Sequence, residues 1–287
     1  MAKTFSLKTI RVTITLGKGV FSEGGNVKVI EGLACEVSVE KPGLPDKNKA
    51  RVKVWGLKLE DMAQLTMLSF RPLESQHNLL EIQAGEQGAA LPLVFRGEIL
   101  SAFADFNSAP DVCMEFTADS GTYAQQIAAS PASAQGEVNA DGLFALFAAE
   151  AGYTYKNEGV SASVRNPWLA GSPVDKLVKL ARDIGCELLI DDGSVLVMPA
   201  GRARSGGTVL LSKETGLIGY PTFNQDGISC RCIFNPGLQH GGLVQVKSIV
   251  PRSSGLWRVN KLTHNLGAYQ PSGGSWETQL EAVYHGE

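Results

Sequence analysis

The sequence predicts a mainly β protein in which two β-barrel-like regions flank a small α/β region. Short runs of alternating polar and apolar residues occupy both ends of the chain. Glycine, proline and asparagine separate these runs, as they do in turns. The longer helical patterns lie only in the middle of the chain. We therefore expect three domains, over residues 1–118, 119–205 and 206–287.

The first region reads as a small barrel or sandwich with one helix. Its predicted strands cover residues 11–16, 26–29, 34–40, 49–55, 79–84, 93–104 and 112–118. Turn residues separate several of them, including Gly24-Gly25 and Pro42-Gly43. A helix is predicted over residues 59–67, because its apolar residues fall on one side.

The middle region combines helices with strands. One helix is predicted over residues 143–151, and Gly152 can end it. Ser172 and Pro173 mark the start of a second helix, which Gly185 ends. Strands are predicted over residues 186–190 and 195–198, joined by a tight turn. The order helix, glycine, strand thus occurs twice, as a faint internal repeat.

The second β region follows a linker over residues 201–206. Its predicted strands cover residues 208–211, 227–234, 243–249, 256–265 and 278–284. Turn residues again separate them.

Composition limits the classes of function. The chain has 287 residues and a formal net charge of −3, which argues against a general nucleic-acid binder. Its five cysteines are scattered and odd in number, which favours reduced thiols over a disulfide framework. No apolar run reaches the roughly 18 residues that a membrane span needs. The N-terminal residues lack the apolar core of a signal peptide, so we expect the chain to stay in the compartment where it is made.

No motif points to catalysis. The segment Gly273–Glu277 comes nearest to the Gly-x-Ser-x-Gly elbow, but it lacks the last glycine, so Ser275 is interpreted as a hairpin-loop residue. The adjacent Asp191 and Asp192 could be a pair of catalytic carboxylates, but their place before Gly193 favours a tight turn. We therefore expect a protein that is not an enzyme.

Metal binding is also the weaker interpretation. Cys230 and Cys232 would point the same way from a strand, but the nearby sequence offers only His240 as a further ligand. Two cysteines facing a core are the more frequent case. We expect no metal and no cofactor.

Two aromatic residues are candidate partner contacts. Trp168 and Phe223 fall in segments that read as loops, where a large apolar side chain would be exposed to solvent. We expect a partner to bury at least one of them.

Three stretches resemble a known family. The first runs from Trp55-Gly56-Leu57 through Phe95-Arg96-Gly97 to Ala118–Gly121, and the second covers residues 172–199. The third covers residues 214–248 and continues with the strands "WRVNKLTH" and "WETQLEA". Together they span nearly the whole chain, in order. They resemble the central baseplate hub proteins of contractile-tailed bacteriophages, a group that includes Mu-like hubs and is related to type VI and tailocin hubs.

The resemblance implies a structural virion protein of the tail baseplate. Members are homotrimers in which each subunit gives two similar barrels, so that three subunits form a ring of six. The ring would adapt a six-fold tail tube to a three-fold spike and nucleate tail assembly. Expected partners are therefore the tail tube protein, the trimeric spike, the baseplate wedge proteins and the tape measure protein, with DNA only passing through the lumen. Assembly would take place in the cytoplasm of the bacterial host.

Three alternatives remain open. A hub or tail-tip protein of a tailocin, a type VI-like injector or a non-contractile phage would share the fold. A tail-associated cell-wall hydrolase would need a catalytic acid and its pocket. A glycan-binding module is suggested only by analogy of fold.

Overall fold

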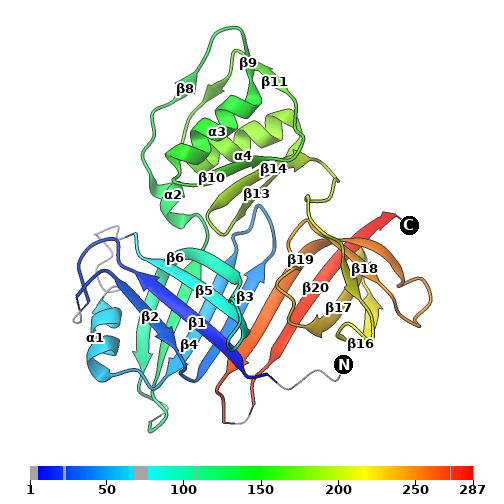
Figure 1. The fold of residues 1–287 in the computed structure, drawn as a ribbon. Helices are drawn as coiled ribbons and strands as arrows, with labels where there is room; N and C mark the ends of the chain where they lie inside the picture. The colour runs from blue at the N-terminus through cyan, green and yellow to red at the C-terminus, as the bar shows by residue number, and fades with distance from the viewer. Residues whose placement is uncertain (1–5, 22–23, 68–76, 108, 272, 287) are drawn as a thin grey trace.

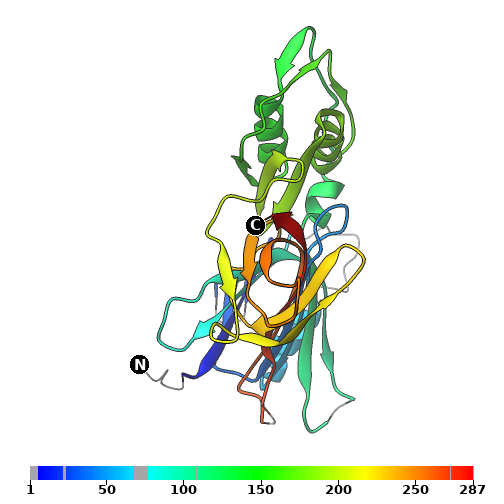
Figure 2. The ribbon, with the colours of Figure 1, turned by 90° about the vertical axis from the view of Figure 1, so that its right-hand side faces the viewer.

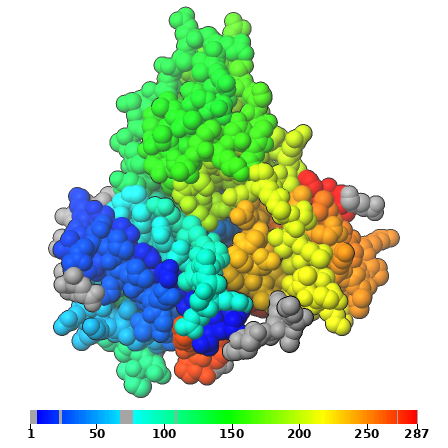
Figure 3. All heavy atoms as spheres, viewed as in Figure 1, coloured from blue at the N-terminus to red at the C-terminus, as the bar shows by residue number. Residues whose placement is uncertain are grey.

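A computed structural model of the chain describes residues 6–21, 24–67, 77–107, 109–271 and 273–286. The N-terminal residues 1–5, searched above for a signal peptide, lie outside the described residues. Two β regions lie side by side, with an α/β region above them (Figure 1). The space-filling view shows the α/β region projecting as a lobe (Figure 3).

The first β region is a curved antiparallel sheet with one helix. Its elements are β1 (Lys8–Thr15), β2 (Val27–Glu31), β3 (Cys35–Lys41), β4 (Lys49–Trp55), α1 (Leu59–Met67), β5 (Leu79–Glu86), β6 (Leu93–Asp105) and β7 (Cys113–Asp119). Alternate residues point into one core, as in β3, where Val37 and Val39 are buried while Glu36 and Glu40 are exposed. α1 packs against β6 and adds Leu65 to this core.

The α/β region packs two helices on a small sheet. Its elements are α2 (Thr122–Gln126), β8 (Ala132–Ser133), β9 (Glu137–Asn139), α3 (Ala140–Glu150), β10 (Thr154–Asn157), β11 (Ser163–Arg165), β12 (Trp168–Leu169), α4 (Pro173–Ile184), β13 (Cys186–Asp191) and β14 (Ser194–Pro199). The strands β10, β14 and β13 form the sheet, and α3 and α4 lie side by side on one of its faces (Figure 1). Phe144 and Phe147 of α3 and Leu177 of α4 are fully buried between these layers.

The second β region is again antiparallel for the most part. Its strands are β15 (Val209–Leu211), β16 (Leu217–Phe223), β17 (Gly227–Ile233), β18 (Leu243–Val246), β19 (Gly255–Ala268) and β20 (Trp276–Gly286). Its own core holds Cys230 and Cys232, which face inward together, and the indole of Trp257.

The two β regions share one sheet. β19 pairs antiparallel with β3, from Leu262 opposite Lys41 to Ala268 opposite Cys35. The resulting 13-stranded sheet runs in the order β16-β17-β20-β19-β3-β4-β7-β6-β5-β1-β2, with β15 and β18 attached beside β19. The two regions are therefore joined by backbone hydrogen bonds as well as by the chain that connects them.

The two β regions also repeat one strand order. In the first, β3, β4, β7 and β6 are neighbours in that order, and in the second β16, β17, β20 and β19 are. In each region the last strand of this series, β6 or β19, is long. Its first part pairs with the strand that precedes it in the sequence, and its later part pairs with the strand that follows it in the sequence. The register of that long strand shifts at matching places, between Ile99 and Ser101 in β6 and between Val259 and Lys261 in β19.

The mainly β fold class is confirmed, and several elements lie where the sequence predicts them. β4 and α1 have the predicted bounds. α4 is capped as expected, since Ser172 and Asp175 form a capping box and Gly185 ends the helix with a φ of 76°. Both repeats of helix, glycine and strand are present, at Gly152 before β10 and at Gly185 before β13.

Three predictions were wrong in detail. Phe223 ends the strand β16, and Trp168 begins the two-residue strand β12, so neither lies in a loop. β16 was missed because Gly219 has a φ of 69° and Pro221 cannot donate to a ladder; an edge strand tolerates both. β18 ends at Val246 rather than near residue 249, because the chain turns from Ser248 to Ser254, whose side chain accepts the Ser248 N–H.

Candidate functional site

Buried charges fix the turn of the β13–β14 hairpin between the α/β region and the two β regions. Lys41 Nζ, at the end of β3, donates to Asp191 Oδ1 at 2.8 Å and to Asp192 Oδ2 at 2.7 Å. Arg204 Nη1 donates to Asp191 Oδ2 at 3.0 Å, and the backbone N–H of Arg96 in β6 donates to Asp192 Oδ1 at 3.1 Å. One turn is therefore bonded to β3, to β6 and to the segment that leads into the second β region.

Opposite charges in this cluster stabilise one another, although burial and the neighbouring charge of Asp191 raise the pKa of Asp192. Burial alone would lower the pKa of Lys41, but the carboxylates of Asp191 and Asp192 outweigh it and raise that pKa. Burial likewise opposes ionisation of Asp191, but Lys41 and Arg204 hold its pKa down at about 2. The two aspartates thus serve as anchors of a turn with positive φ at Asp192 and Gly193, as the tight-turn interpretation predicted.

A second, partly buried ion pair joins the α/β region to the second β region. Arg258 Nη2, in β19, donates to Glu187 Oε2 of β13. Arg258 occupies the place in β19 that Glu98 occupies in β6, since each lies just before the shift in register. Glu98 is buried too, and its Oε2 accepts the backbone N–H of Gly121, where the chain enters the α/β region. Equivalent positions of the two β regions therefore contact the α/β region with opposite charges.

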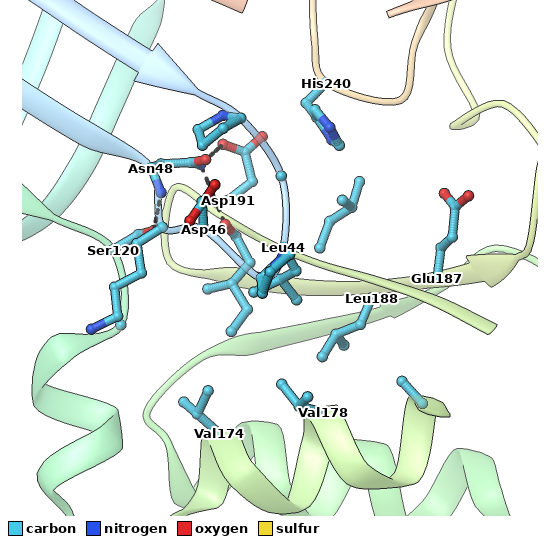
Figure 4. A pocket seen from close by; sticks show the side chains of 18 of the residues that line it. Leu44, Asp46, Asn48, Ser120, Val174, Val178, Glu187, Leu188, Asp191 and His240 are labelled. Atoms are coloured by element: carbon cyan, nitrogen blue, oxygen red, sulfur yellow. Dashed lines mark hydrogen bonds between the residues drawn. The ribbon is translucent and has the colours of Figure 1, made fainter. Parts of the chain in front are cut away.

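A cleft of about 960 Å³ lies at this junction (Figure 4). The β3–β4 loop, α4 and β13 form most of its wall, and His240 closes it from the second β region. The side chains of Val174, Val178 and Leu188 make its apolar side (Figure 4). Burial lowers the pKa of His240, so this imidazole is neutral near pH 7.

Among the residues that the structure describes, the junction brings no set of reacting side chains together. Asp191 is bonded to Lys41, Asn48 and Arg204. Within the described ranges, no group of three or more His, Cys, Asp or Glu side chains could hold a metal ion. Ser275 lies directly before β20, as the hairpin interpretation predicted.

The outer face of the sheet is polar across both β regions. Eight neighbouring strands, from β16 to β6, contribute to it. Salt bridges join neighbours on β4 and β7, with Arg51 Nε 3.5 Å and Lys53 Nζ 3.8 Å from oxygens of Glu115. Across the β3–β19 junction, Ser38 Oγ donates to Asn265 Oδ1 at 3.0 Å. Other side chains of this face are Glu36, Glu40, Lys49, Thr117, Ser229, Arg231, Thr263, Glu277, Gln279 and Glu281.

Large apolar side chains are exposed on the two strands that end this face. At one end, in β16, Tyr220 is 65 % exposed; Phe223, which pairs opposite the buried Ile228 and so points to the other face of the sheet, is 55 % exposed. At the other end, Leu100 and Phe103 of β6 are 49 % and 42 % exposed, and Phe106 follows directly. Exposed apolar groups that line the edge of a sheet are typical of surfaces that bind other chains.

The two predicted partner contacts lie far apart in the fold. Phe223 belongs to the edge strand β16. Trp168 lies on the α/β region and is 62 % exposed, with Lys179 Nζ 5.7 Å from the centroid of its ring. The junction charges were not predicted as a site, although Asp191 and Asp192 had been singled out. Their partner Lys41 lies 150 residues away in sequence, and no local pattern shows that pairing.

The family model for the baseplate hub gp41 matches residues 9–270, so the chain belongs to this family of bacteriophage baseplate hub proteins. The resemblance inferred from its motifs is thus confirmed. No curated protein matches the sequence. No helix among the described residues is long and apolar enough to span a membrane.

Solved structures show the same fold at low sequence identity. The tail protein from Neisseria meningitidis MC58 has a TM-score of 0.63 and 10% identity, with 96% of each chain covered. The 43 kDa tail protein of prophage MuSo2 from Shewanella oneidensis has a TM-score of 0.62 and 9% identity, covering 96% of this chain and 97% of that one. The E. coli c3393 protein, a component of the type VI secretion system, has a TM-score of 0.55 and 11% identity, covering 88% and 74%.

Proposed function

We propose that the chain forms a homotrimeric hub that adapts a six-fold tail tube to a three-fold spike and nucleates tail assembly. The observation that carries this proposal is the repeated strand order β3-β4-β7-β6 and β16-β17-β20-β19. Because each chain holds two equivalent units, three chains supply six. A ring of this kind has approximate six-fold symmetry on one side and true three-fold symmetry on the other.

The polar outer face of the sheet suits the lumen of such a ring. Its basic side chains are accompanied by acidic ones, as Arg51 and Lys53 are by Glu115 and as Arg231 is by Glu277. A lumen with neutralised charge lets DNA and the tape measure protein pass without the strong binding that unpaired basic residues produce. We propose that positive charges are present on this face but are balanced by neighbouring carboxylates.

The α/β region then stands away from the sheet, where other components of a baseplate can reach it. Its lobe carries Trp168, which we propose contacts the spike or a wedge protein. The division into domains at residues 118 and 205 belongs to this proposal, as do assembly in the host cytoplasm and the absence of catalytic activity. The comparisons support a structural role through the family, whose name is that of a baseplate hub.

The test is the molar mass of the purified protein by light scattering across a concentration series. A trimer of the 30.6 kDa chain that dissociates on dilution supports the proposal, and six-lobed rings in electron micrographs strengthen it. A stable dimer would contradict it, since two-fold symmetry cannot match a three-fold spike.

A hub of a type VI-like injector is the second candidate. The likeness of fold to the E. coli type VI component favours it. Genes for a sheath and tail fibres next to this gene would favour a phage tail, whereas genes for a membrane-anchored secretion complex would favour the injector.

A further inference from the structure

The hairpin strand β13 leaves one edge unpaired beside the cleft at the junction. Among the described strands it pairs with β14 only, and the two-residue turn makes Asp191 and Ser194 a hydrogen-bonded pair. Such pairs alternate with pairs that are not hydrogen-bonded, so Leu188 and Ile190 turn their backbone N–H and C=O groups away from β14. The Ile190 carbonyl shows this direction, because it accepts a hydrogen bond from Asn48 Nδ2 at 3.3 Å. No described group bonds the N–H or the C=O of Leu188, so a donor and an acceptor are free on this edge.

The walls around this edge are apolar and leave room for a further chain. Val174 and Val178 of α4 line the cleft, as do Leu44 of the β3–β4 loop and Leu188 of β13 itself (Figure 4). Its volume of about 960 Å³ is at the upper end of the roughly 300–1,000 Å³ that is typical of ligand sites. β13 has six residues, so its edge is about 20 Å long at roughly 3.3 Å per residue. An extended polypeptide segment of similar length suits this site.

Unpaired charges of opposite sign lie at the two ends of the cleft. Where β13 begins, Arg182 in the last turn of α4 is exposed and forms no ion pair with a described residue. Arg258 lines the same end through its bond to Glu187; it is only 6% exposed, and its Nε has no acceptor among the described residues. At the other end, the exposed Asp46 has no described cation beside it and lies on the loop that carries Asn48. The cleft therefore favours a carboxylate where β13 begins and a basic group where β13 ends.

We propose that the cleft binds the C-terminal tail of another protein, which pairs with β13 as an added antiparallel strand. In this direction the tail ends beside Arg182, so that its terminal carboxylate meets the free guanidinium, while a basic side chain at its start faces Asp46. Alternate side chains of the tail are apolar, because they contact Val174 and Val178. Main-chain hydrogen bonds to the open edge supply affinity, and the flanking side chains supply specificity. This docking site does not depend on the proposed trimer.

The other edge of the same small sheet provides a contrast. β10 also pairs with β14 only, among the described strands, but it has four residues, and the side chain of Lys156 on it is 59% exposed. Short length and an exposed lysine are common features that keep an edge from binding a further strand. β13 is longer and carries no lysine, so the edge beside the cleft lacks both protections.

Selection of peptides on the full-length chain tests the proposal. Random peptides of about six residues, the length of β13, are displayed by their N-termini, so that each terminal carboxylate is free. The enriched sequences are then synthesised with a fluorescent label, and their binding is measured by anisotropy. We expect them to alternate apolar residues and to bind at least ten-fold more weakly when the terminal carboxylate is amidated.

Two variants of the chain test the two kinds of contact. L188P removes the N–H on the open edge without removing a bond to β14, which is the position where edge strands tolerate proline. R182E reverses the charge that faces the carboxylate. Each should weaken binding at least ten-fold, and R182E should regain it with peptides that end in an amidated lysine. The matched control is R165E, which reverses an exposed charge of the same region outside the cleft and should bind as the parent chain does.

Each outcome decides a part of the proposal. If no peptide is enriched, or if the enriched peptides bind R182E and L188P as they bind the parent chain, the cleft does not dock a strand. Circular dichroism reports whether L188P is folded, and R182E with its rescue decides alone if it is not. Binding that amidation leaves unchanged would overturn the terminal carboxylate and the direction of the tail. If no peptide is enriched and R182E self-associates less than R165E by light scattering, the occupant is a second copy of this chain and not another protein.

Discussion

The two β regions are built on one strand order but differ at their outer strands. β3 is covered by β19, and its outer face is polar. β16 takes the same place in the second unit, yet it is open and aromatic. We therefore attribute the shared strand order to the fold of each unit, and the difference between the outer strands β3 and β16 to their positions in the assembly. The polar strand β3 is paired within the chain. The strand β16, which carries exposed aromatic residues, is the one expected to contact another molecule.

The units also differ in how they hold the α/β region. The first uses Lys41 at the end of β3, which binds two carboxylates of one turn. The second uses Arg258, which binds Glu187. The Lys41 cluster is the more deeply buried, because the side chain of Asp191 is 9% exposed and that of Glu187 is 32% exposed.

The largest expected effect on stability comes from disrupting the Lys41 cluster, the more deeply buried of these two groups of ion pairs. Lys41→Ala leaves Asp191 and Asp192 buried beside each other, and we expect a loss of about 3–5 kcal/mol in the free energy of unfolding. Arg258→Ala leaves a more exposed carboxylate and should cost about 1–3 kcal/mol. Urea unfolding followed by circular dichroism measures both.

A surface ion pair provides the control for these losses. Arg11→Ala removes the pair between Arg11 Nε and Glu31 Oε2, whose side chains are 40% and 38% exposed, and should cost about 0.5 kcal/mol or less. Equal losses for Lys41→Ala and Arg11→Ala would show that the cluster does not anchor the turn.

The second prediction concerns the two aromatic candidates. Phe223→Ala should weaken the trimer at least ten-fold in dissociation constant, because aromatic groups central to an interface contribute more than about 1.4 kcal/mol each. Trp168→Ala should leave the trimer unchanged, since Trp168 belongs to β12 of the α/β region, and this region projects as a lobe (Figure 3). Light scattering on dilution compares the variants. A variant that carries both Phe223→Ala and Trp168→Ala tests the two residues together. If this variant forms the trimer and binds the spike and wedge proteins as the parent chain does, neither residue is a partner contact.

The third prediction concerns stability at low pH, which a titratable residue of the second β region should affect and its counterpart in the first should not. His264 in β19 is buried, and burial together with the charge of Lys41 lowers its pKa to about 3. In the unfolded chain its pKa lies near 6.5. Between these values the unfolded state binds a proton that the folded state excludes, so stability falls as the pH falls, by about 1.4 kcal/mol for each pH unit. The counterpart in β6, Ala104, cannot titrate.

His264→Gln can keep the hydrogen bond to Thr278 Oγ1, which lies 2.8 Å from His264 Nδ1, while removing the titration. We expect it to flatten the decline in unfolding midpoint between pH 6 and pH 4.5, whatever its effect at pH 7. An unchanged slope would assign the acid sensitivity in this range to another group, such as His240, whose pKa is also lowered by burial. Asp191, whose pKa is lowered to about 2, contributes a loss of stability only below about pH 4, outside this range.

Local signals in the sequence were sufficient for much of this fold. The alternation over residues 49–55 and the cap at Ser172 depend on neighbours a few residues apart, and both were predicted correctly. The β3–β19 junction joins residues more than 220 positions apart, as Ser38 and Asn265 are, and no periodicity indicates which two strands will meet. The aromatic edge was found in part, through Phe223, because a large exposed apolar side chain is visible in sequence even where its strand is not.

The smallest effect on stability is expected on the outer face of the sheet. Glu115→Gln removes the partner of Arg51 and Lys53 in the first unit, and Glu277→Gln removes that of Arg231 in the second. Arg51 is 68% exposed and Arg231 is 55% exposed. Each change should therefore alter the free energy of unfolding by less than about 1 kcal/mol.

The same substitutions should change how the face meets DNA. If it lines the lumen with paired charges, the double variant leaves basic side chains unpaired and should retain duplex DNA at 50 mM salt but not at 200 mM salt, because such binding depends on the release of counterions. The variant E31Q/E60Q, on β2 and α1 outside the face, neutralises two carboxylates as the double variant does, and so adds the same net charge without changing the pairs on the face. Equal DNA retention by E31Q/E60Q and the double variant would mean that net charge alone is responsible, and the pairing of charges on this face would lose its proposed role.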